Sequence, residues 1–374
     1  AFPAAVLNDL LNEGKYDRGV IVVVPRSYET IDKVYAPYDN LALYVALHAD
    51  GSVDKKVIGS MTEALKADYQ FQDWQRLVEI FRNPTLQMVS FTITEKGYAF
   101  NDDDLSRGLK PALVMGKVTA LMLERYNAGQ LPVTLQSMDN CSHNGDTLKR
   151  AVLAYAGRWV SDGLAPQGFV DYLNDETRVT FPWSMIDKIT PRPHPMVEKT
   201  LTEDGIEDMS PIITSKKTFI APFVNAEKPQ YLVVEDRFPN GRPALEKAGV
   251  YFCDRATVNM TETMKVTTCL NPLHTAMSMY GCLLGYTLIC EEMKDVDIRP
   301  FIQKIGYIEA MPVVTDPGVI NPYEFIGTVI NRRLPNPFMP DTPQRIAMDT
   351  SQKIPIRFGE TIKKYLARGL DLSN

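Results

Sequence analysis

The stretch Gly19-Val-Ile-Val-Val-Val24 decides the fold class, because an unbroken β-branched run of this length is typical of a strand buried on both faces. Outward from this stretch, the chain alternates between strand-like and helix-like patterns. Strand composition occurs at residues 41–49, 86–94 and 132–138, and helical spacing at residues 3–13, 74–81 and 105–125. The alternation predicts parallel βαβ units, and therefore an α/β domain built on an open sheet.

The pattern changes after Gly145. A helix is predicted at residues 147–160, and the proline-dense segment Thr190-Pro-Arg-Pro-His-Pro195 indicates a connector between domains. Beyond the connector, residues 218–223 and 231–234 have strand composition and residues 273–370 are mostly helical in pattern. We therefore predict an N-terminal α/β domain over residues 1–185 and a mainly α-helical domain with a small β insertion over residues 186–374.

Composition narrows the range of partners. The 374 residues include 40 Lys and Arg against 46 Asp and Glu, and the net charge of −6 provides no positive field for holding nucleic acid. The longest weakly polar stretch, residues 271–290, contains a histidine and two glycines. It falls short of the roughly 18 continuous apolar residues that a membrane span needs. We expect a small-molecule ligand, no nucleic acid or membrane partner, and a monomer or weak homo-oligomer.

The cysteines indicate the compartment. There are five of them, an odd number, and none forms a Cys-x-x-Cys pair. Such usage is typical neither of a disulfide framework nor of a zinc site. We predict free thiols in a reducing cytoplasm and no metal.

Asn140 is a candidate ligand-binding residue, because it follows the predicted strand at residues 132–138 and precedes a helix. Its side chain would lie at the carboxyl edge of the sheet, where ligands bind in open α/β folds. The alternative is that Asp139, Asn140 and Asn144 are only turn and helix-capping residues.

The stretch Lys265-Val-Thr-Thr-Cys-Leu-Asn271-Pro-Leu-His274 combines three groups with complementary chemistry. Asn271 precedes a proline as an N-cap precedes the first residue of a helix, and His274 is three residues further on, so both can face one point. A carboxamide, an imidazole and a nearby amine can bind a hydroxyl or carbonyl oxygen and accept its proton. A capping asparagine, a satisfied histidine and a solvated lysine are the alternative.

Two further charged residues have open roles. Asp187 follows the apolar pair Met185-Ile186, which predicts a half-buried carboxylate, and a surface ion pair with Lys188 or Arg192 is the alternative. Arg333 is a candidate clamp for an anionic group, or else the basic end of an ordinary helix.

These segments together resemble one family. The motifs, in chain order, are Asp139-Asn140 with Asn144-Gly145, Met185-Ile-Asp187-Lys-Ile-Thr-Pro191, Arg237-Phe-Pro-Asn-Gly-Arg242-Pro, Met264-Lys265 through Leu270-Asn271-x-x-His274, and Arg333-x-x-Asn336 with Asp349-x-Ser-Gln-Lys353. In this order they resemble the long-chain mannitol dehydrogenase family of polyol and hexonate oxidoreductases. The similarity covers nearly the whole chain, and five separated motifs are far more specific than one.

The resemblance implies a metal-free, nicotinamide-dependent dehydrogenase with an N-terminal Rossmann-type domain, a mainly helical C-terminal domain and an active site between them. It implies that Lys265 is the general base, which requires burial or a nearby cation to lower the lysine pKa from about 10.4. Asn140 and Asn271 would hold the reacting oxygen, and His274 would orient the substrate.

The resemblance also implies supporting roles. Asp187 would be a supporting carboxylate of the active site, and Arg333 and Lys353 would contact the distal part of the substrate. Thr94 and Glu95, in the segment Thr94-Glu-Lys-Gly97, would lie beside the cofactor together with Asn140.

Two features depart from the family pattern. Lys265 and Asn271 are six residues apart, whereas the family spacing is five, and a one-residue bulge would absorb the difference. The family's first strand and its Gly-x-Gly-x-Phe-x-Arg loop do not occur in these 374 residues, and Ala1-Phe2 resembles the residues just after that loop. The pattern therefore predicts that this sequence belongs to a longer protein.

The end of the 19–24 strand bears on the cofactor. Pro25-Arg26-Ser27 lacks the acidic residue that would bind the ribose hydroxyls of NAD, and Arg26 could tolerate the 2′-phosphate of NADP. NAD is the commoner cofactor in the family. We therefore expect NAD, with NADP as the alternative.

The basic set Lys216, Lys217, Arg333 and Lys353 favours an anionic substrate. We therefore expect interconversion of a keto-sugar acid and a hexonate, namely fructuronate and mannonate. Mannitol or another polyol is the alternative substrate, and a family member without catalytic activity is the alternative from another class.

Overall fold

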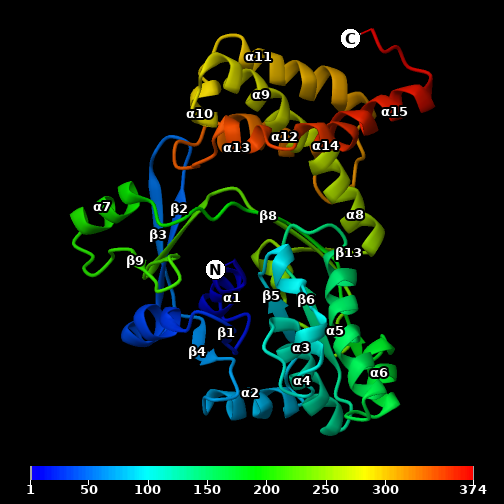
Figure 1. Ribbon diagram of the computed structural model, residues 1–374. Coiled ribbons are helices and arrows are strands. Elements are labelled where there is room, and N and C mark those ends of the chain that lie inside the picture. Colours follow the sequence, from blue (N-terminus) through cyan, green and yellow to red (C-terminus); the bar gives the residue numbers. More distant parts are fainter. Residues whose placement is uncertain (1, 374) are drawn as a thin grey trace.

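The computed structural model describes residues 2–373. Figure 1 shows the strands and helices of the N-terminal half at the bottom and a group of C-terminal helices at the top. The strands β2 (Ala42–Leu47) and β3 (Val53–Ile58) run between them. The predicted fold class, an α/β region followed by a mainly helical one, is confirmed. Among the described residues, no helix has the length and apolar character that crossing a bilayer requires.

The N-terminal half contains two parallel sheets. β1 (Val20–Val24) pairs with β4 (Met61–Lys66). β6 (Val133–Ser137) pairs with β5 (Met88–Phe91) on one side and with β7 (Val179–Thr180) on the other. The helices of this half are α1 (Phe2–Asn12), α2 (Asp73–Arg82), α3 (Asp102–Leu105), α4 (Val114–Asn127), α5 (Asn144–Ser161) and α6 (Gln167–Asn174). The largest core cluster lies among β5 to β7 and α4 to α6, where Tyr155, Trp159 and Phe169 are fully buried.

Two mixed sheets link the halves. β2 pairs antiparallel with β3 and parallel with β11 (Phe223–Glu227). β12 (Tyr231–Glu235) pairs antiparallel with β8 (Ser184–Asp187) and parallel with β13 (Tyr251–Cys253). β9 (Ile212–Ile213) and β10 (Phe219–Ile220) form a short hairpin after α7 (Pro195–Glu203). β2 and β11 lie on opposite sides of residue 185, the predicted boundary between the two domains, and yet they pair in one sheet. The boundary stays a prediction.

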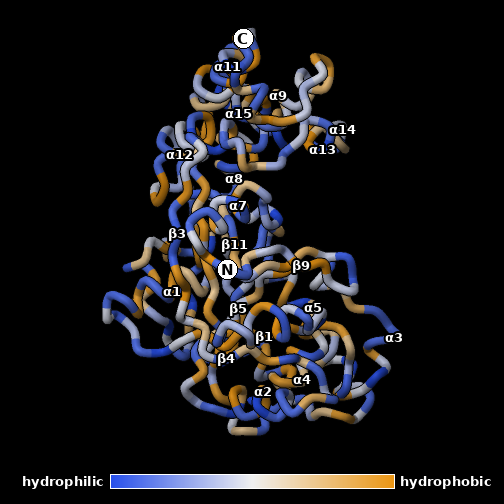
Figure 2. Tube along the Cα trace, turned by 90° about the vertical axis from the view of Figure 1, so that its left-hand side faces the viewer, coloured by the Kyte–Doolittle hydropathy of each residue, from blue (hydrophilic) through white to orange (hydrophobic). Residues whose placement is uncertain are grey.

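The C-terminal region is helical. A second core cluster surrounds α9, with Leu273, Met277 and Phe325 fully buried. Figure 2 shows these helices stacked above the α/β half, with hydrophilic residues along the outlying loop near α3. The helices are α8 (Arg255–Met264), α9 (Asn271–Leu284), α10 (Ile289–Glu292), α11 (Ile298–Gln303), α12 (Pro322–Thr328), α13 (Pro343–Ala347), α14 (Thr350–Ile354) and α15 (Glu360–Arg368).

The strand predicted at residues 19–24 forms, but its full burial is wrong. Val23 is 42% exposed, and the other residues of β1 are only half-buried. Within residues 2–373, β4 is the one ladder partner of β1. A strand that pairs on one side only cannot be enclosed as the middle strand of a sheet would be.

The helix predicted at residues 105–125 begins only at Val114. Pro111 cannot occupy a helix interior, because it lacks an N–H and its ring clashes with the preceding turn. The buried carboxylate of Asp104 accepts hydrogen bonds from the N–H groups of Ala112 at 2.7 Å and Leu113 at 3.1 Å. These bonds hold the chain in a loop until the helix starts.

The prediction of purely parallel βαβ units is wrong for the second and third strands. β2 and β3 form an antiparallel hairpin that turns at Gly51, where φ is +87°. β3 was missed because its sequence, Val-Asp-Lys-Lys-Val-Ile, is largely polar and exposed. The strand predicted at residues 218–223 is divided between β10 and β11, with Pro222 between them, since proline donates no ladder hydrogen bond.

Glu292 makes the stability of the helical region depend on pH. It is fully buried against Gly281, neither carboxyl oxygen has a hydrogen-bond partner among the described residues, and burial raises its pKa to about 8, with Asp295 adding to the shift. The unfolded chain therefore loses this proton at a lower pH than the folded chain, and stability falls as the pH rises from the ordinary glutamate pKa to about 8. At pH 8 we expect Glu292→Gln to raise the free energy of unfolding, by about 1.4 kcal/mol for each unit by which the pKa of Glu292 in the folded chain exceeds that in the unfolded chain. At pH 4 the substitution should change the free energy of unfolding little.

Urea unfolding of both proteins at the two pH values would measure this effect. Glu291→Gln is the matched control, because Glu291 is exposed and pairs with Lys294 at 2.9 Å. An equal stability difference at pH 4 and pH 8 would contradict the assignment to Glu292.

Candidate active site

The loops after β5 and β6 face the end of α8. Burial raises the pKa of the Cys141 thiol to about 12, and the carboxylates of Asp139, Glu95 and Glu262 add to the shift. These three acids come from the β6 loop, the segment after β5, and α8. Contacts join the same elements: Tyr98, after β5, donates a hydrogen bond to Asp139, and Nε2 of His143 in the β6 loop lies 3.2 Å from Oδ1 of Asn259 in α8. The elements therefore meet at the carboxyl edge of the β5–β6–β7 sheet.

Lys265 lies in this region and is buried, with 8% of its surface exposed. Its Nζ donates hydrogen bonds to Oδ1 of Asn140 at 3.4 Å and to the carbonyl of Ile186 at 3.2 Å. Burial lowers the pKa of Lys265, the carboxylates of Asp187 and Glu262 oppose the shift, and Arg333 adds to it. A lysine that is desolvated and beside a carboxamide can be neutral near pH 7, as a general base must be.

The backbone between Lys265 and Asn271 contains a π-helical turn over Lys265–Cys269. A π turn adds one residue to a helix, which accommodates the spacing of six residues without moving Lys265 from the site. The predicted N-cap role of Asn271 is wrong, because α9 begins at Asn271 itself and Leu270 occupies the cap position. The π turn shifts the helix start by one residue.

Arg333 is enclosed by two carboxylates. Its guanidinium donates to Asp187 and, through Nε and Nη2, to Glu227 at 2.9 and 2.7 Å. All three side chains are at most 6% exposed. Asp187 is thus fully buried, and its partner is neither Lys188 nor Arg192. Arg333 is the last residue of the helical turn Val329–Arg333, as the basic-helix-end alternative predicts, but its side chain is buried among carboxylates and not solvated.

His274 and Arg357 lie close together, because Arg357 contacts Thr275, the residue that follows His274. Burial lowers the pKa of His274. The carboxylate of Asp341, whose Oδ2 lies 3.9 Å from Nε2 of His274, opposes this shift. The cations Arg357, Arg345 and Arg333 add to it. Arg357 is half-buried and donates to the hydroxyl of Thr275. Among residues 2–373 its guanidinium has no carboxylate partner, and burial alone lowers its pKa. This unpaired cation is suited to an anionic ligand.

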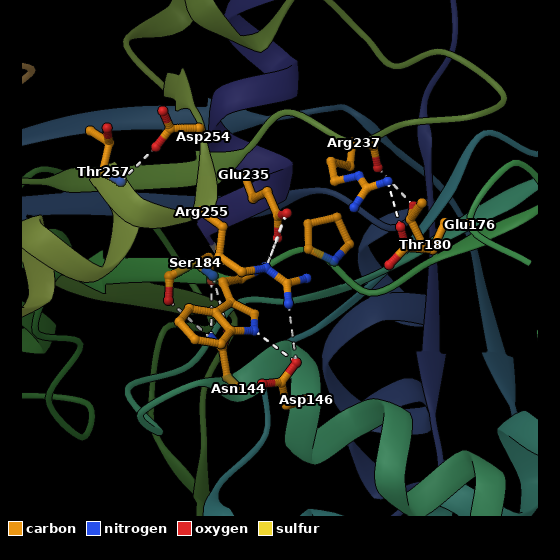
Figure 3. Close-up of polar contacts among 12 residues, drawn as sticks. Asn144, Asp146, Glu176, Thr180, Ser184, Glu235, Arg237, Asp254, Arg255 and Thr257 are labelled. Atoms are coloured by element: carbon orange, nitrogen blue, oxygen red, sulfur yellow. Dashed lines mark hydrogen bonds and ion pairs between the residues drawn. The ribbon is translucent and has the colours of Figure 1, made fainter. Parts of the chain in front are cut away.

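The turn interpretation holds for Asp139, but the capping interpretation is wrong for Asn144, because α5 begins at Asn144 itself and His143 occupies the cap position. Asp139 accepts hydrogen bonds from Tyr98 and from the N–H of Cys141. Asn144 bonds the backbone N–H, the carbonyl and the hydroxyl of Ser184 at 3.0 to 3.2 Å, and so joins α5 to β8. Figure 3 shows this pair. The carboxamide of Asn140 is directed instead to Lys265.

A polar network fixes the start of α8, the helix that leads to Lys265. Arg255 binds the buried carboxylate of Glu235 at 3.0 and 3.1 Å and approaches Asp146 of α5 at 3.5 Å, and Asp254 caps the helix by accepting the N–H of Thr257 (Figure 3). The network ties α8 to β12 and to the α/β half, and this anchoring positions the lysine.

The residues predicted at the cofactor lie beyond the carboxyl ends of three strands. Thr94 and Glu95 are exposed and follow β5, and Asn140 follows β6. Arg26 follows β1 and lines a cavity of about 860 Å³. This is the edge at which dinucleotides bind in doubly wound sheets, and the cavity is large enough for the adenosine end of one.

The Nζ of Lys353 donates to the carbonyls of Ile346, at 2.9 Å, and of Met348, and its predicted contact with the distal part of the substrate stays a prediction. The sequence interpretation missed Glu227 and Arg357. Glu227 stands in a strand with no distinctive motif around it. Arg357 follows Lys353 by one helical turn, and that spacing was the one signal that could have found it.

Comparison with known proteins places these features in a family. The model of the mannitol dehydrogenase Rossmann domain matches residues 1–247, and that of the mannitol dehydrogenase C-terminal domain matches residues 257–374. The chain is 54% identical to D-mannonate oxidoreductase of Thermotoga maritima, over 98% of this chain and 70% of that protein. It is 30% identical to polyol:NADP oxidoreductase of Gluconobacter oxydans, over 86% of this chain and 64% of that protein.

Two solved structures resemble the whole fold. D-sorbitol dehydrogenase in substrate-free form superposes with a TM-score of 0.84 at 25% identity. The match covers 99% of this chain and 74% of the D-sorbitol dehydrogenase chain. Mannitol 2-dehydrogenase of Pseudomonas fluorescens, in a ternary complex with NAD and D-mannitol, superposes with a TM-score of 0.74 at 28% identity. This match covers 99% of this chain and 73% of the mannitol 2-dehydrogenase chain. The resemblance inferred from the sequence motifs is therefore confirmed, and the chain belongs to the mannitol dehydrogenase family.

Proposed function

We propose that this chain forms a nicotinamide-dependent dehydrogenase that interconverts a keto-sugar acid and a hexonate, with fructuronate and mannonate as the pair. The observation that carries the proposal is the buried Lys265, whose Nζ contacts Asn140 at the carboxyl edge of the sheet. NAD is the proposed cofactor, supported by the Rossmann-domain match and by the NAD complex of the similar mannitol 2-dehydrogenase.

The chain's own residues supply the proton chemistry. In the oxidising direction, the neutral Nζ of Lys265 accepts the hydroxyl proton of the substrate and becomes an ammonium group. The carboxamide of Asn140, and that of Asn271, stabilise the charge that develops on the oxygen. In the reducing direction, the ammonium group returns the proton to the carbonyl oxygen. The nicotinamide ring supplies the hydride acceptor or donor.

Thr94, Glu95, Arg26 and Asn140 are the proposed cofactor contacts, because they lie at the carboxyl ends of the strands. His274, which burial keeps neutral near pH 7, would orient the substrate by a hydrogen bond. Arg333 would act by holding Asp187 beside Lys265, rather than by gripping the substrate, because two carboxylates already occupy it.

The hexonate is proposed on two grounds. The D-mannonate oxidoreductase of Thermotoga maritima is 54% identical to this chain. In addition, Arg357 offers a cation without a carboxylate partner among residues 2–373, next to His274. A substrate carboxylate that leaves water needs such a charge-assisted partner.

Arg357→Leu should therefore raise KM for fructuronate by about tenfold or more, the scale of one charge-assisted hydrogen bond. For neutral fructose, KM should change by less than about twofold. Lys363→Met is the matched control, because Lys363 is exposed and pairs with Glu360 at 2.8 Å. Equal losses on both substrates would show that Arg357 supports the fold or binds a hydroxyl.

The proposal as a whole is tested by steady-state assays of fructuronate, tagaturonate, fructose and fructose 6-phosphate with NADH and with NADPH. A kcat/KM for fructuronate well above that for fructose supports it. Preference for fructose would favour mannitol 2-dehydrogenase, the activity named for one of the two structural neighbours. Absence of turnover together with no NADH binding at micromolar concentration would indicate a family member without catalytic activity. The cytoplasm stays the predicted compartment, consistent with five free thiols.

A further inference from the structure

The cavity beside Arg26 is formed by elements that are distant in sequence. It lies beyond the carboxyl ends of the paired strands β1 and β4, and it extends to the loop that precedes α4. The hairpin between β9 and β10 contributes Lys216, and Ser215 of this hairpin binds Glu29 through its N–H and its hydroxyl at 2.9 and 2.8 Å. The wall of the cavity is therefore held together by bonds between the two halves of the chain.

The charges in this cavity are not balanced among themselves. Each of its three carboxylates already has partners within the protein: Glu29 with Lys33 and Ser215, Asp32 with Lys66, and Asp68 with Tyr28 and Lys117. Three of its cations, Arg26, Lys110 and Lys216, have no carboxylate partner among residues 2–373. An anionic ligand would compensate for this surplus of positive charge.

A fourth cation in the wall is buried. Lys117 is 5% exposed, its Nζ donates to the carbonyl of Ala67 at 2.6 Å, and Asp68 lies 3.6 Å away. Burial is the main cause of the lowered pKa of Lys117. Asp68 opposes this shift, and Arg26 is close enough to add to it. Two cations held near each other, one of them desolvated, favour a ligand that carries more than one negative charge.

The position of Arg26 identifies the ligand's chemistry. In doubly wound sheets, an acidic residue near the end of the second strand binds the ribose 2′-hydroxyl, and an arginine there accommodates a 2′-phosphate. β1 ends at Val24, and Pro25, Arg26 and Ser27 follow it, with no carboxylate among them. A guanidinium can bind two phosphate oxygens at once, and the hydroxyl of Ser27 can donate a further bond.

We propose that this cavity binds the 2′-phosphate of NADP(H), with Arg26 and Lys110 as its direct partners, so that the enzyme uses NADP(H) as well as NAD(H). The inference rests on the proposed dehydrogenase function. It concerns only the adenosine end of the cofactor, and it does not depend on which sugar is reduced.

Binding of nucleotide fragments tests the inference without catalysis. Isothermal titration of the full-length protein with adenosine 2′,5′-bisphosphate, with 5′-ADP and with inorganic phosphate separates the 2′-phosphate from the other sources of an anion. We expect the 2′,5′-bisphosphate to bind at least tenfold more tightly than 5′-ADP, and phosphate alone to bind weakly. In Arg26→Ser or Lys110→Gln the preference should fall below about threefold while 5′-ADP affinity stays the same.

Both side chains are exposed, so these variants should fold normally, and Lys304→Gln, an exposed lysine of the helical region, is the matched control. Equal binding of the two nucleotides by the unmodified protein would overturn the inference, and so would a preference that survives both substitutions. A preserved 2′-phosphate preference without turnover of any sugar would reject the proposed substrate but not this site.

Discussion

Replacing Lys265 by alanine is expected to lower the turnover number by about a hundredfold or more, the usual scale for losing general acid–base catalysis. The loss is expected because Lys265 is the amine bonded to Asn140, where the substrate proton would be transferred. NADH affinity should change little, because Lys265 is not one of the proposed cofactor contacts and does not line the cavity beside Arg26. Steady-state kinetics and a fluorescence titration with NADH would measure the two effects.

The pH dependence gives a second readout of the same variant. The base must be neutral for oxidation, so the rate of hexonate oxidation by the unmodified protein should rise with pH through the lowered pKa of Lys265, and the alanine variant should lose this limb. Lys188→Ala is the matched control. Burial lowers the pKa of Lys188 to about 8, but its Nζ is bonded to the carbonyl of Glu227 at 2.8 Å. If Lys188→Ala removed the limb and Lys265→Ala did not, the base would be Lys188.

Replacing Arg333 by leucine is expected to destabilise the fold by about 3–5 kcal/mol, because removing one partner of a buried ion pair leaves the others uncompensated. Asp187 and Glu227 would both be left without their cation in a site that is at most 6% exposed. Burial raises the pKa of Glu227 and Arg333 opposes that rise, so without the guanidinium Glu227 would take up a proton. Urea unfolding followed by circular dichroism would measure the change.

Arg332→Leu is the neighbouring control, because Arg332 is exposed and should change stability by less than about 0.5 kcal/mol. Arg333→Lys should recover part of the stability, since a single ammonium group replaces some of the charge but not the paired hydrogen bonds. If Arg333→Leu unfolds at the same urea concentration as the unmodified protein, the ion cluster is not a structural element and Arg333 is free to bind substrate.

The sequence could predict the elements whose pattern is local. The helix at α2 and the strands β2, β5 and β6 follow from hydrophobic periodicity, because burial of one face is a property of neighbouring residues. The hairpin partner β3 could not be predicted in this way, since its exposed face is polar and its strand character comes from pairing with β2. The order of the five motifs was also enough to predict the family of the chain, because together these motifs span nearly its whole length.

The sequence by itself determined which residues are available for chemistry: Lys265, Asn140 and Asp187 were identified from their motifs. Only the tertiary structure decided their partners. Asp187 meets Arg333 across 146 residues of chain and Glu227 meets it across 106. It also decided that Arg26 and Arg357, among other cations, have no carboxylate partner within residues 2–373. The physical reason is that the energy of a charge depends on its distance to other charges and on its burial, and both are set by segments far apart in the sequence.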